Sequence, residues 1–442
     1  MTLVPPGPGP ATGPEPGAAR AGVAGVDDGE RWLRAHFVRT WAKLEDIGRG
    51  PGGGYTRPPW GKADAELRQW FRDEAGVRGM PVEQAGNGNL WAWWGEPGAS
   101  AAPPGAREHR ALAIGSHLDS VPDGGAFDGP LGLVCSYLAI DVLRSAGGVP
   151  VRPIAVVCWA DEEGARFGAA CAGSRLLTGA LSPGTARALV DDEGVTMAEA
   201  MQRAGADPAL LGPDPARLAS LLAFVELHIE QGRRLVDLGA PVGIATAIWP
   251  HGRWRCSFRG EPNHAGTTLL ADRHDPMLPF AAAVIEAREI AEGKGGRATF
   301  AKVVVWPNAT NAVAARVDAW LDARAPDEPT LKTMVAQVGD AARRSSAAHG
   351  VQFELLNESL TGTVEFEQAL RTRLVGALGN LPQLPTAAGH DAGTLSACVP
   401  TAMLFVRNPT GTSHSPAEWA SADDCVAGAR ALARVLEELA CR

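Results

Sequence analysis

The sequence predicts an α/β protein in which a larger domain with a mostly parallel sheet is interrupted by an inserted α+β domain of the ferredoxin-like type. Continuous apolar runs of strand length, such as residues 154–159 (IAVVCW), alternate with helical patterns, as in parallel sheets covered by helices on both faces. Residues 241–358 follow a β-α-β-β-α-β order preceded by one strand. That order predicts a compact sandwich inserted into the larger domain.

The larger domain is expected to begin after a Pro- and Gly-rich segment, residues 1–28, which we expect to be a disordered tail rather than a secretory signal. Its first part, residues 29–240, alternates two kinds of pattern. Helical patterns lie at residues 30–47, 63–74 and 131–144 and within 170–211. Strand patterns lie at residues 89–94, 111–114, 154–159 and 222–229.

The insertion and the return to the larger domain follow in order. Within the insertion, strands are expected at residues 242–247, 254–260, 299–306, 312–324 and 351–356. Two helices, at residues 275–290 and 330–347, separate them. The second part of the larger domain, residues 359–442, has helical patterns at 364–378, 390–397 and 416–440 around a strand at 401–405.

Composition limits the possible partners and compartments. The net charge of −9 and the lack of a basic stripe argue against a nucleic-acid partner. No apolar run approaches the ~18–20 residues that span a bilayer, so no membrane partner is expected. The seven cysteines include no C-x-x-C pair, which favours reduced thiols in the cytoplasm over a disulfide framework.

Potential metal ligands recur where the predicted strands end. They are His117 and Asp128, Glu162 and Glu163, His228, and His414. Carboxyl ends of parallel strands meet at one edge of a sheet, so these side chains are expected to converge. Imidazoles and carboxylates without thiolates suit Zn²⁺, Mn²⁺ or Co²⁺, and a bridging carboxylate could hold two ions about 3.5–4 Å apart.

The ordinary alternative is that each histidine is a hydrogen-bonded structural residue and that Glu162–Glu163 is a solvated pair. Recurrence at four separate strand ends favours the metal site. The adjacent glutamates suggest divided roles, with one carboxylate on metal and the other as general base.

Seven motifs in order are similar to those of a known family. They are GSHLDSVPDGGAFDGPLG, DEEGARFGAACAGSRLLTGAL, ELHIEQG, GEPNHAGTTLLADRHDPM, residues 308–324, AGHDAG and TSHSP. Across residues 30–440 the chain resembles the two-metal amidohydrolases of the aminoacylase-like superfamily, in the branch of N-carbamoyl-L-amino-acid hydrolase and allantoate amidohydrolase. The resemblance implies a catalytic α/β domain, an inserted lid that also dimerises, and two divalent ions per subunit, with Zn²⁺ favoured over Mn²⁺ or Co²⁺.

The resemblance also implies a role for each metal ligand. His117 and His228 would bind one metal, Glu163 and His414 the other, and Asp128 would bridge the two. Having His228 rather than an aspartate in ELHIEQG favours the carbamoylase and allantoate branch over peptidases.

The matched motifs imply three catalytic residues. Glu162 matches the general base, and Asp119 matches the carboxylate that orients His117. His264 resembles the residue that steadies the oxyanion, in the family usually supplied by the partner subunit.

Substrate contacts are implied in the same way. Asn311 and Arg324 resemble the clamp on a substrate carboxylate, for which a planar guanidinium suits two-point binding. Gln231 resembles a contact to the scissile group, and His390 lies near the pocket in the family.

We therefore expect a cytoplasmic homodimer that hydrolyses an N-carbamoyl-L-amino acid or allantoate, releasing ammonia and carbon dioxide. One alternative is hydrolysis of N-formyl or formimino amino acids, such as glutamate derivatives, on the same metal centre. Another is a catalytically silent ligand-binding dimer. The retention of Glu162 together with all the ligand types argues against the silent protein, because a binding module needs no base.

Overall fold

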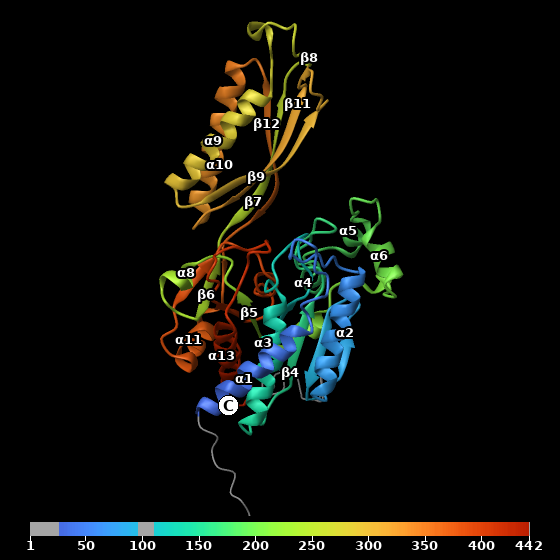
Figure 1. Ribbon diagram of the computed structural model, residues 1–442, viewed down its shortest axis with the longest axis vertical. Helices are drawn as coiled ribbons and strands as arrows, with labels where there is room; N and C mark the ends of the chain where they lie inside the picture. The colour runs from blue at the N-terminus through green and yellow to red at the C-terminus, as the bar shows by residue number, and fades with distance from the viewer. Residues whose placement is uncertain (1–25, 96–109, 442) are drawn as a thin grey trace, which may run out of the picture.

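The computed structural model describes residues 26–95 and 110–441 and divides into a larger and a smaller part (Figure 1). Most of the predicted tail lies outside the described residues. Residues 26–28 already begin helix α1 (Val26–Ala42), four residues before the predicted start of this helix. Within the described ranges, no helix is long and apolar enough to cross a membrane.

The larger part is built on a nine-stranded sheet, which confirms the predicted α/β class. Its order is β1-β2-β4-β3-β5-β15-β6-β13, with β14 also pairing with β6. The pairs β3–β4, β3–β5, β5–β15 and β6–β14 are parallel. The strands are β1 (Val82–Gln84), β2 (Leu90–Trp94), β3 (Ala111–His117), β4 (Ile154–Trp159), β5 (Leu221–Ile229), β6 (Val242–Ile248), β13 (Val364–Glu365), β14 (Gln383–Thr386) and β15 (Thr401–Val406).

Helices cover both faces of this sheet, so that alternate residues of a strand enter different cores. Ile114 and Val156 join the core under α1, α3 (Pro130–Ser145) and α13 (Ala422–Ala440), whereas Ala113 and Val157 face the opposite core. Every residue of β3 and β4 is buried, which explains why their sequences are continuous apolar runs. The other helices of this part are α2 (Lys62–Val77), α4 (Ala172–Thr178), α5 (Pro183–Ala188), α6 (Met197–Arg203), α7 (Pro215–Ala219), α8 (Arg234–Asp237), α11 (Gln368–Leu378) and α12 (Asp391–Leu395).

The inserted part is a four-stranded antiparallel sheet with two helices on one face, in the order β12-β7-β11-β9 expected for a ferredoxin-like unit. Its core lies between sheet and helices. A two-stranded ribbon, β8 with β10, lies at the end of the insertion far from the larger part (Figure 1). The elements are β7 (His251–Arg259), β8 (Asn263–His264), α9 (Met277–Gly293), β9 (Arg297–Trp306), β10 (Ala312–Val313), β11 (Arg316–Arg324), α10 (Glu328–Ala348) and β12 (Gln352–Thr361).

The boundaries of the insertion differ from those expected at residues 241 and 358. Strand β6 pairs with β15 and β14 in the large sheet, so the inserted sheet spans residues 251–361. Burial gives the physical reason. Val242 to Ala245 are consecutively buried, as in a strand covered on both faces, whereas β11 of the insertion alternates between buried and half-buried residues.

Candidate metal centre

The parallel strands β3, β4, β5 and β15 end at one edge of the large sheet, and the predicted ligands gather there. His117 is the last residue of β3, and His228 lies one residue before the end of β5. Glu162 and Glu163 follow β4, Asp128 precedes α3, and His414 lies in the loop after β15. The topology therefore brings together residues that are widely separated in the sequence.

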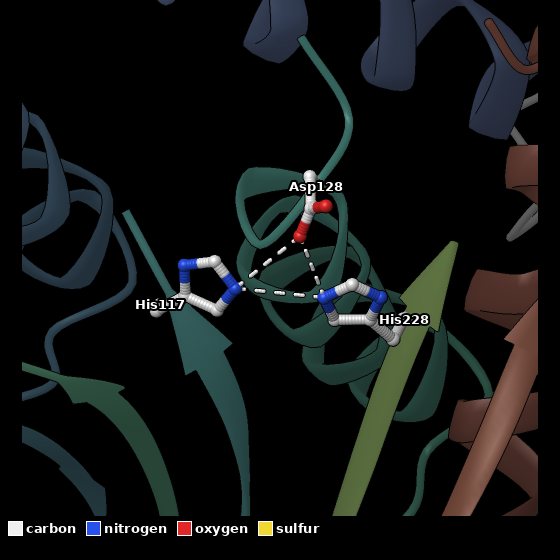
Figure 2. A group of neighbouring side chains, drawn as sticks. All are labelled: His117, Asp128 and His228. Atoms are coloured by element: carbon white, nitrogen blue, oxygen red, sulfur yellow. Dashed lines mark hydrogen bonds and ion pairs between the residues drawn. The ribbon is translucent and has the colours of Figure 1, made fainter. Parts of the chain in front are cut away.

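Three of these side chains form a compact triangle of ligand atoms (Figure 2). His228 Nε2 lies 3.1 Å from Asp128 Oδ1, His117 Nε2 lies 3.5 Å from the same oxygen, and the two Nε2 atoms are 3.5 Å apart. Zinc bonds of about 2.0–2.2 Å at tetrahedral angles separate ligand atoms by about 3.3–3.5 Å. The spacing of the three atoms fits a divalent ion.

A second group uses the other oxygen of Asp128. His414 Nε2 lies 3.5 Å from Asp128 Oδ2 and 3.4 Å from Glu163 Oε1. Glu163 Oε1 is buried and has no hydrogen-bond partner among the described residues, so a cation would satisfy it. Because Asp128 offers one oxygen to each group, the donor set fits two ions bridged by one carboxylate.

Hydrogen bonds to backbone carbonyls fix how the two buried histidines present their rings. His117 Nδ1 is 3.1 Å from the carbonyl oxygen of Asp119, and His228 Nδ1 is 2.9 Å from that of Ile229. A carbonyl oxygen only accepts, so these bonds place a proton on Nδ1, and in the neutral ring they leave the Nε2 lone pair facing Asp128.

The carboxylate of Asp119 holds the loop that carries the two glutamates. Its Oδ1 and Oδ2 accept the backbone N–H groups of Glu162 and Glu163 at 3.1 and 3.0 Å. Its Oδ1 is 3.6 Å from His117 Nδ1, which hydrogen-bonds the Asp119 carbonyl instead. Asp119 thus contacts His117 mainly through its backbone carbonyl, whereas its carboxylate positions the backbone of Glu162 and Glu163.

Glu162 is placed to exchange protons beside the first group. Its Oε2 lies 3.8 Å from His117 Nε2, and its Oε1 accepts a hydrogen bond from the thiol of Cys171 at 3.3 Å. Burial raises the pKa of Glu162 well above its usual range, Asp391 and Glu163 add to the rise, and His117 opposes it. A carboxylate with a raised pKa is a stronger base than one in water.

The centre concentrates negative charge that a cation would offset. Burial and the carboxylate of Asp128 raise the pKa of Glu163 to about 8. Burial also disfavours charged His117, but the nearby carboxylates of Asp119, Asp128 and Glu162 outweigh it and hold its pKa well above the ordinary value. Divalent cations commonly compensate carboxylate clusters of this kind.

Two predicted substrate contacts border the ligand atoms. Gln231 Nε2 donates to Asp128 Oδ2 at 2.8 Å and lies 3.3 Å from His414 Nε2. The ring of His390 is 4.5 Å from that of His228, and its buried Nε2 has no hydrogen-bond partner among the described residues. Burial and the neighbouring His228 hold the pKa of His390 well below its usual value, so its imidazole is neutral.

Arg324 lies at the end of β11 and joins the inserted domain to the larger one. Its Nη1 donates to the carbonyl oxygen of Ala387 at 2.7 Å, three residues before His390. Its Nε and Nη2 donate to the carboxylate of Asp322 at 2.8 and 3.2 Å. The structure therefore places Arg324 on the side of the insertion that faces the metal centre.

The structure does not bring His264 and Asn311 to the centre of their own chain. His264 ends β8 of the ribbon and Asn311 directly precedes β10, at the far end of the insertion (Figure 1). Both are exposed, and Ala265 N donates to the carbonyl oxygen of Asn311. The backbone N–H groups of Gly266 and Thr267 both donate to His264 Nδ1, so neutral His264 carries its proton on Nε2 as an available donor.

Sequence reasoning missed several residues at the centre, among them Glu226, which lies beside His228 and His390. Cys171 touches Glu162, and Ser413 and Glu418 contact Asp128 or its backbone. The spacing of His414 and Glu418 in HSPAE was the only available signal, because an acid four residues after a ligand remains close to it in a turn.

The chain is similar to known proteins over most of its length. The family model described as Peptidase family M20/M25/M40 matches residues 113–438. The chain is 34% identical to an N-carbamoyl-L-amino acid amidohydrolase of Geobacillus stearothermophilus over 91% of this chain and 98% of that protein. It is 32% identical to an allantoate amidohydrolase of Escherichia coli strain K12, with coverages of 92% and 98%.

A solved structure extends this likeness to the fold. A hydantoinase/carbamoylase family amidase from Burkholderia vietnamiensis matches with a TM-score of 0.81 at 28% identity, over 92% of this chain and 98% of that one. Together these matches confirm the resemblance drawn from the seven motifs.

Proposed function

The chain belongs to peptidase family M20/M25/M40, and from this premise we propose that it is an amidohydrolase acting on a linear, non-peptide C–N bond. The proposed substrates are N-carbamoyl-L-amino acids or allantoate, whose hydrolysis releases ammonia and carbon dioxide. The names of the two relatives support this substrate class. The observation that carries the proposal is the pair of ligand groups that share Asp128, with Glu162 beside them.

The proposed cofactor is two divalent ions per subunit, zinc by preference, with manganese or cobalt as alternatives. His117 and His228 would hold one ion, Glu163 and His414 the other, and Asp128 both. Bound divalent ions supply Lewis acidity toward the substrate carbonyl and toward water. The all-nitrogen and oxygen donor set supports these metals over those that prefer thiolates.

Glu162 is the proposed proton carrier. Its carboxylate removes a proton from the water that attacks the carbonyl carbon and later gives that proton to the leaving nitrogen. This role requires a base that does not bind metal and whose pKa is raised. Glu162 meets this need because its Oε1 is engaged by a neutral thiol donor and its Oε2 faces the centre.

Substrate orientation is proposed to come from residues around the ligand atoms. Arg324 would bind the substrate carboxylate, and Gln231 would contact the scissile group. His390, neutral and with an unpaired buried nitrogen, would offer a hydrogen bond to the bound molecule. Asn311 and His264 would complete the site from the partner subunit.

We propose a homodimer formed through the inserted domain. Strand β9 ends the order of the inserted sheet, so its outer edge is open to pairing, and its Val303, Val304 and Trp306 are exposed. Leu278 and Ile285 of the adjoining helix α9 are also exposed, by 52% and 60%. A second copy covering this apolar edge would bury these side chains and could direct its ribbon toward the other subunit's centre.

The proposed location is the cytoplasm, with neither nucleic acid nor membrane as a partner. Five buried free thiols, Cys135, Cys158, Cys171, Cys256 and Cys425, support a reducing compartment. The net charge of −9 supports the absence of a nucleic-acid partner.

The direct test is incubation of zinc-loaded protein with allantoate, a series of N-carbamoyl-L-amino acids and N-formyl-L-glutamate, with ammonia and formate both assayed. Ammonia from either of the first two, lost in Glu162→Gln, supports the proposal and identifies the substrate. Formate alone would move the activity to deformylation on the same centre. Neither product from a metal-loaded protein would favour a silent binding protein.

A further inference from the structure

The loop that carries Asp128 is joined to the loop that carries His414 by one buried carboxylate, that of Glu418. Glu418 is 4% exposed. Its Oε1 accepts the backbone N–H groups of Phe127 and Asp128, each at 2.9 Å. Its Oε2 accepts a hydrogen bond from Ser413 Oγ at 3.2 Å, and the same hydroxyl lies 3.0 Å from Asp128 Oδ2.

From these contacts we infer that Glu418 is a positioning residue for the metal centre, acting with Ser413. Its carboxylate fixes the backbone of Asp128, and Ser413 orients the Oδ2 atom that faces His414. The two loops are about 290 residues apart in the sequence and carry ligands of the same proposed ion. The inference rests on the proposed function only in taking Asp128 and His414 as metal ligands.

Close packing shows that the Asp128 loop is built around this carboxylate. A Cβ atom placed on Gly125 would come within 2.2–2.7 Å of the Glu418 carboxylate, so a larger residue there would push this carboxylate out of its present position. The turn before Glu418 is closed by its backbone, because Glu418 N donates to the carbonyl oxygen of Ser415 at 3.0 Å, and Ser413 in the same loop donates to the carboxylate. Both loops therefore converge on the one side chain.

The charge of Glu418 also favours a role beyond packing. Within the ranges that the structure describes, Glu418 forms no ion pair with an arginine, lysine or histidine. Its three hydrogen-bond donors are all neutral, and a buried carboxylate is costly unless a cation also offsets its charge. A cation bound between Asp128 and His414 would lie one hydrogen-bonded residue away, and it would gain from this negative charge.

The test compares zinc binding by full-length wild-type protein, Glu418→Gln, Ser413→Ala and a control, Glu74→Gln. Glutamine keeps the size of the side chain and an oxygen that can accept the two N–H groups, but it removes the charge and the acceptor for Ser413. Glu74 is also buried, but it pairs with Lys43 and Arg78 rather than with the centre. Each protein is stripped with a chelator and titrated with Zn²⁺ against a competing chromophoric chelator, and its folding is followed by circular dichroism.

We expect Glu418→Gln to bind the Zn²⁺ ion held by Asp128 and His414 about 10- to 100-fold less tightly than the wild-type protein does. A loss of this size is typical when a partner of a metal ligand is removed. Ser413→Ala should weaken the binding of the same ion. Glu74→Gln should lower thermal stability without changing zinc affinity. Unchanged affinity and stoichiometry in Glu418→Gln would overturn the inference. If Glu418→Gln does not fold, Ser413→Ala decides, and wild-type affinity in that variant overturns it. A wild-type protein that binds no zinc would overturn the metal centre itself, whereas failure to hydrolyse ureido substrates would leave this inference intact.

Discussion

The Nε2 atoms of His117 and His228 lie 3.5 Å apart, and both face the same oxygen of Asp128. Each ring uses its Nδ1–H on a backbone carbonyl, so when both rings are neutral three acceptor atoms point at one another with no donor between them. Such an arrangement is repulsive unless a cation or a proton occupies the space. The centre is therefore preorganised for metal, and we expect the folded protein to be less stable when no metal is bound.

The first prediction concerns metal removal. Stripping the protein with a chelator should lower its melting temperature, and Zn²⁺ should restore it, because ions that bind only the folded state stabilise it. Metal content per subunit should fall from two to about one in His414→Ala and to near zero in Asp128→Ala, since Asp128 serves both groups. An untreated protein without bound metal, equally stable after chelation, would contradict this prediction.

Much of this centre could be predicted because its ligands follow strands whose apolar sequences are unambiguous. His117, Glu163 and His228 each lie at or just after a buried run, and parallel pairing then brings them to one edge. Glu418 could not be found this way. Its link to Asp128 spans two irregular loops about 290 residues apart, and no periodicity encodes such a contact.

For a related reason, the sequence could not show that β6 belongs to the large sheet and not to the insertion. Strand β6 has the apolar pattern of any strand, and only its partners β14 and β15 assign it to the large sheet. The ribbon with His264 was predicted as part of the lid, but its position far from its own centre depends on the length and direction of the lid strands. Sequence patterns do not specify such long-range placement.

A second prediction separates the two adjacent glutamates. Glu162→Gln should lower kcat by about 10²- to 10⁴-fold while metal content stays at the wild-type level, since its role is proton transfer. Glu163→Gln should instead lose metal, because Glu163 Oε1 faces His414 Nε2 within the second group. Steady-state kinetics and metal analysis on the same preparations check both. Loss of metal in Glu162→Gln would make it a ligand instead of the base.

The third prediction concerns the carboxylate of the substrate. Arg324→Gln should raise KM about 10- to 100-fold for carboxylate substrates, since a hydrogen bond to a charged group contributes about 1.5–3 kcal/mol. Three of its five N–H groups contact Asp322 and Ala387, which leaves two for the ligand. The corresponding substrate amide is the control, because its KM should change little. An equal rise in KM for acid and amide would assign Arg324 to holding the domains together.

The last prediction tests whether His264 acts across the proposed dimer. His264 is exposed on a ribbon far from its own metal centre, and its Nε2–H is free to donate because Nδ1 accepts two backbone N–H groups. If it completes the partner's site, His264→Ala and Glu162→Gln should each give an inactive dimer. Mixing the two with reversible dissociation should then restore activity.

The restored activity has a defined size. A mixed dimer contains one site with both Glu162 and the partner's His264, and one site that lacks both. Random pairing makes about half of all dimers mixed, so an equimolar mixture should regain about a quarter of wild-type activity. Glu162→Gln mixed with Asp128→Ala is the control and should stay inactive, because both changes disable a site within its own chain. No recovery from a mixture shown by mass spectrometry to contain mixed dimers would mean that His264 does not act across the interface.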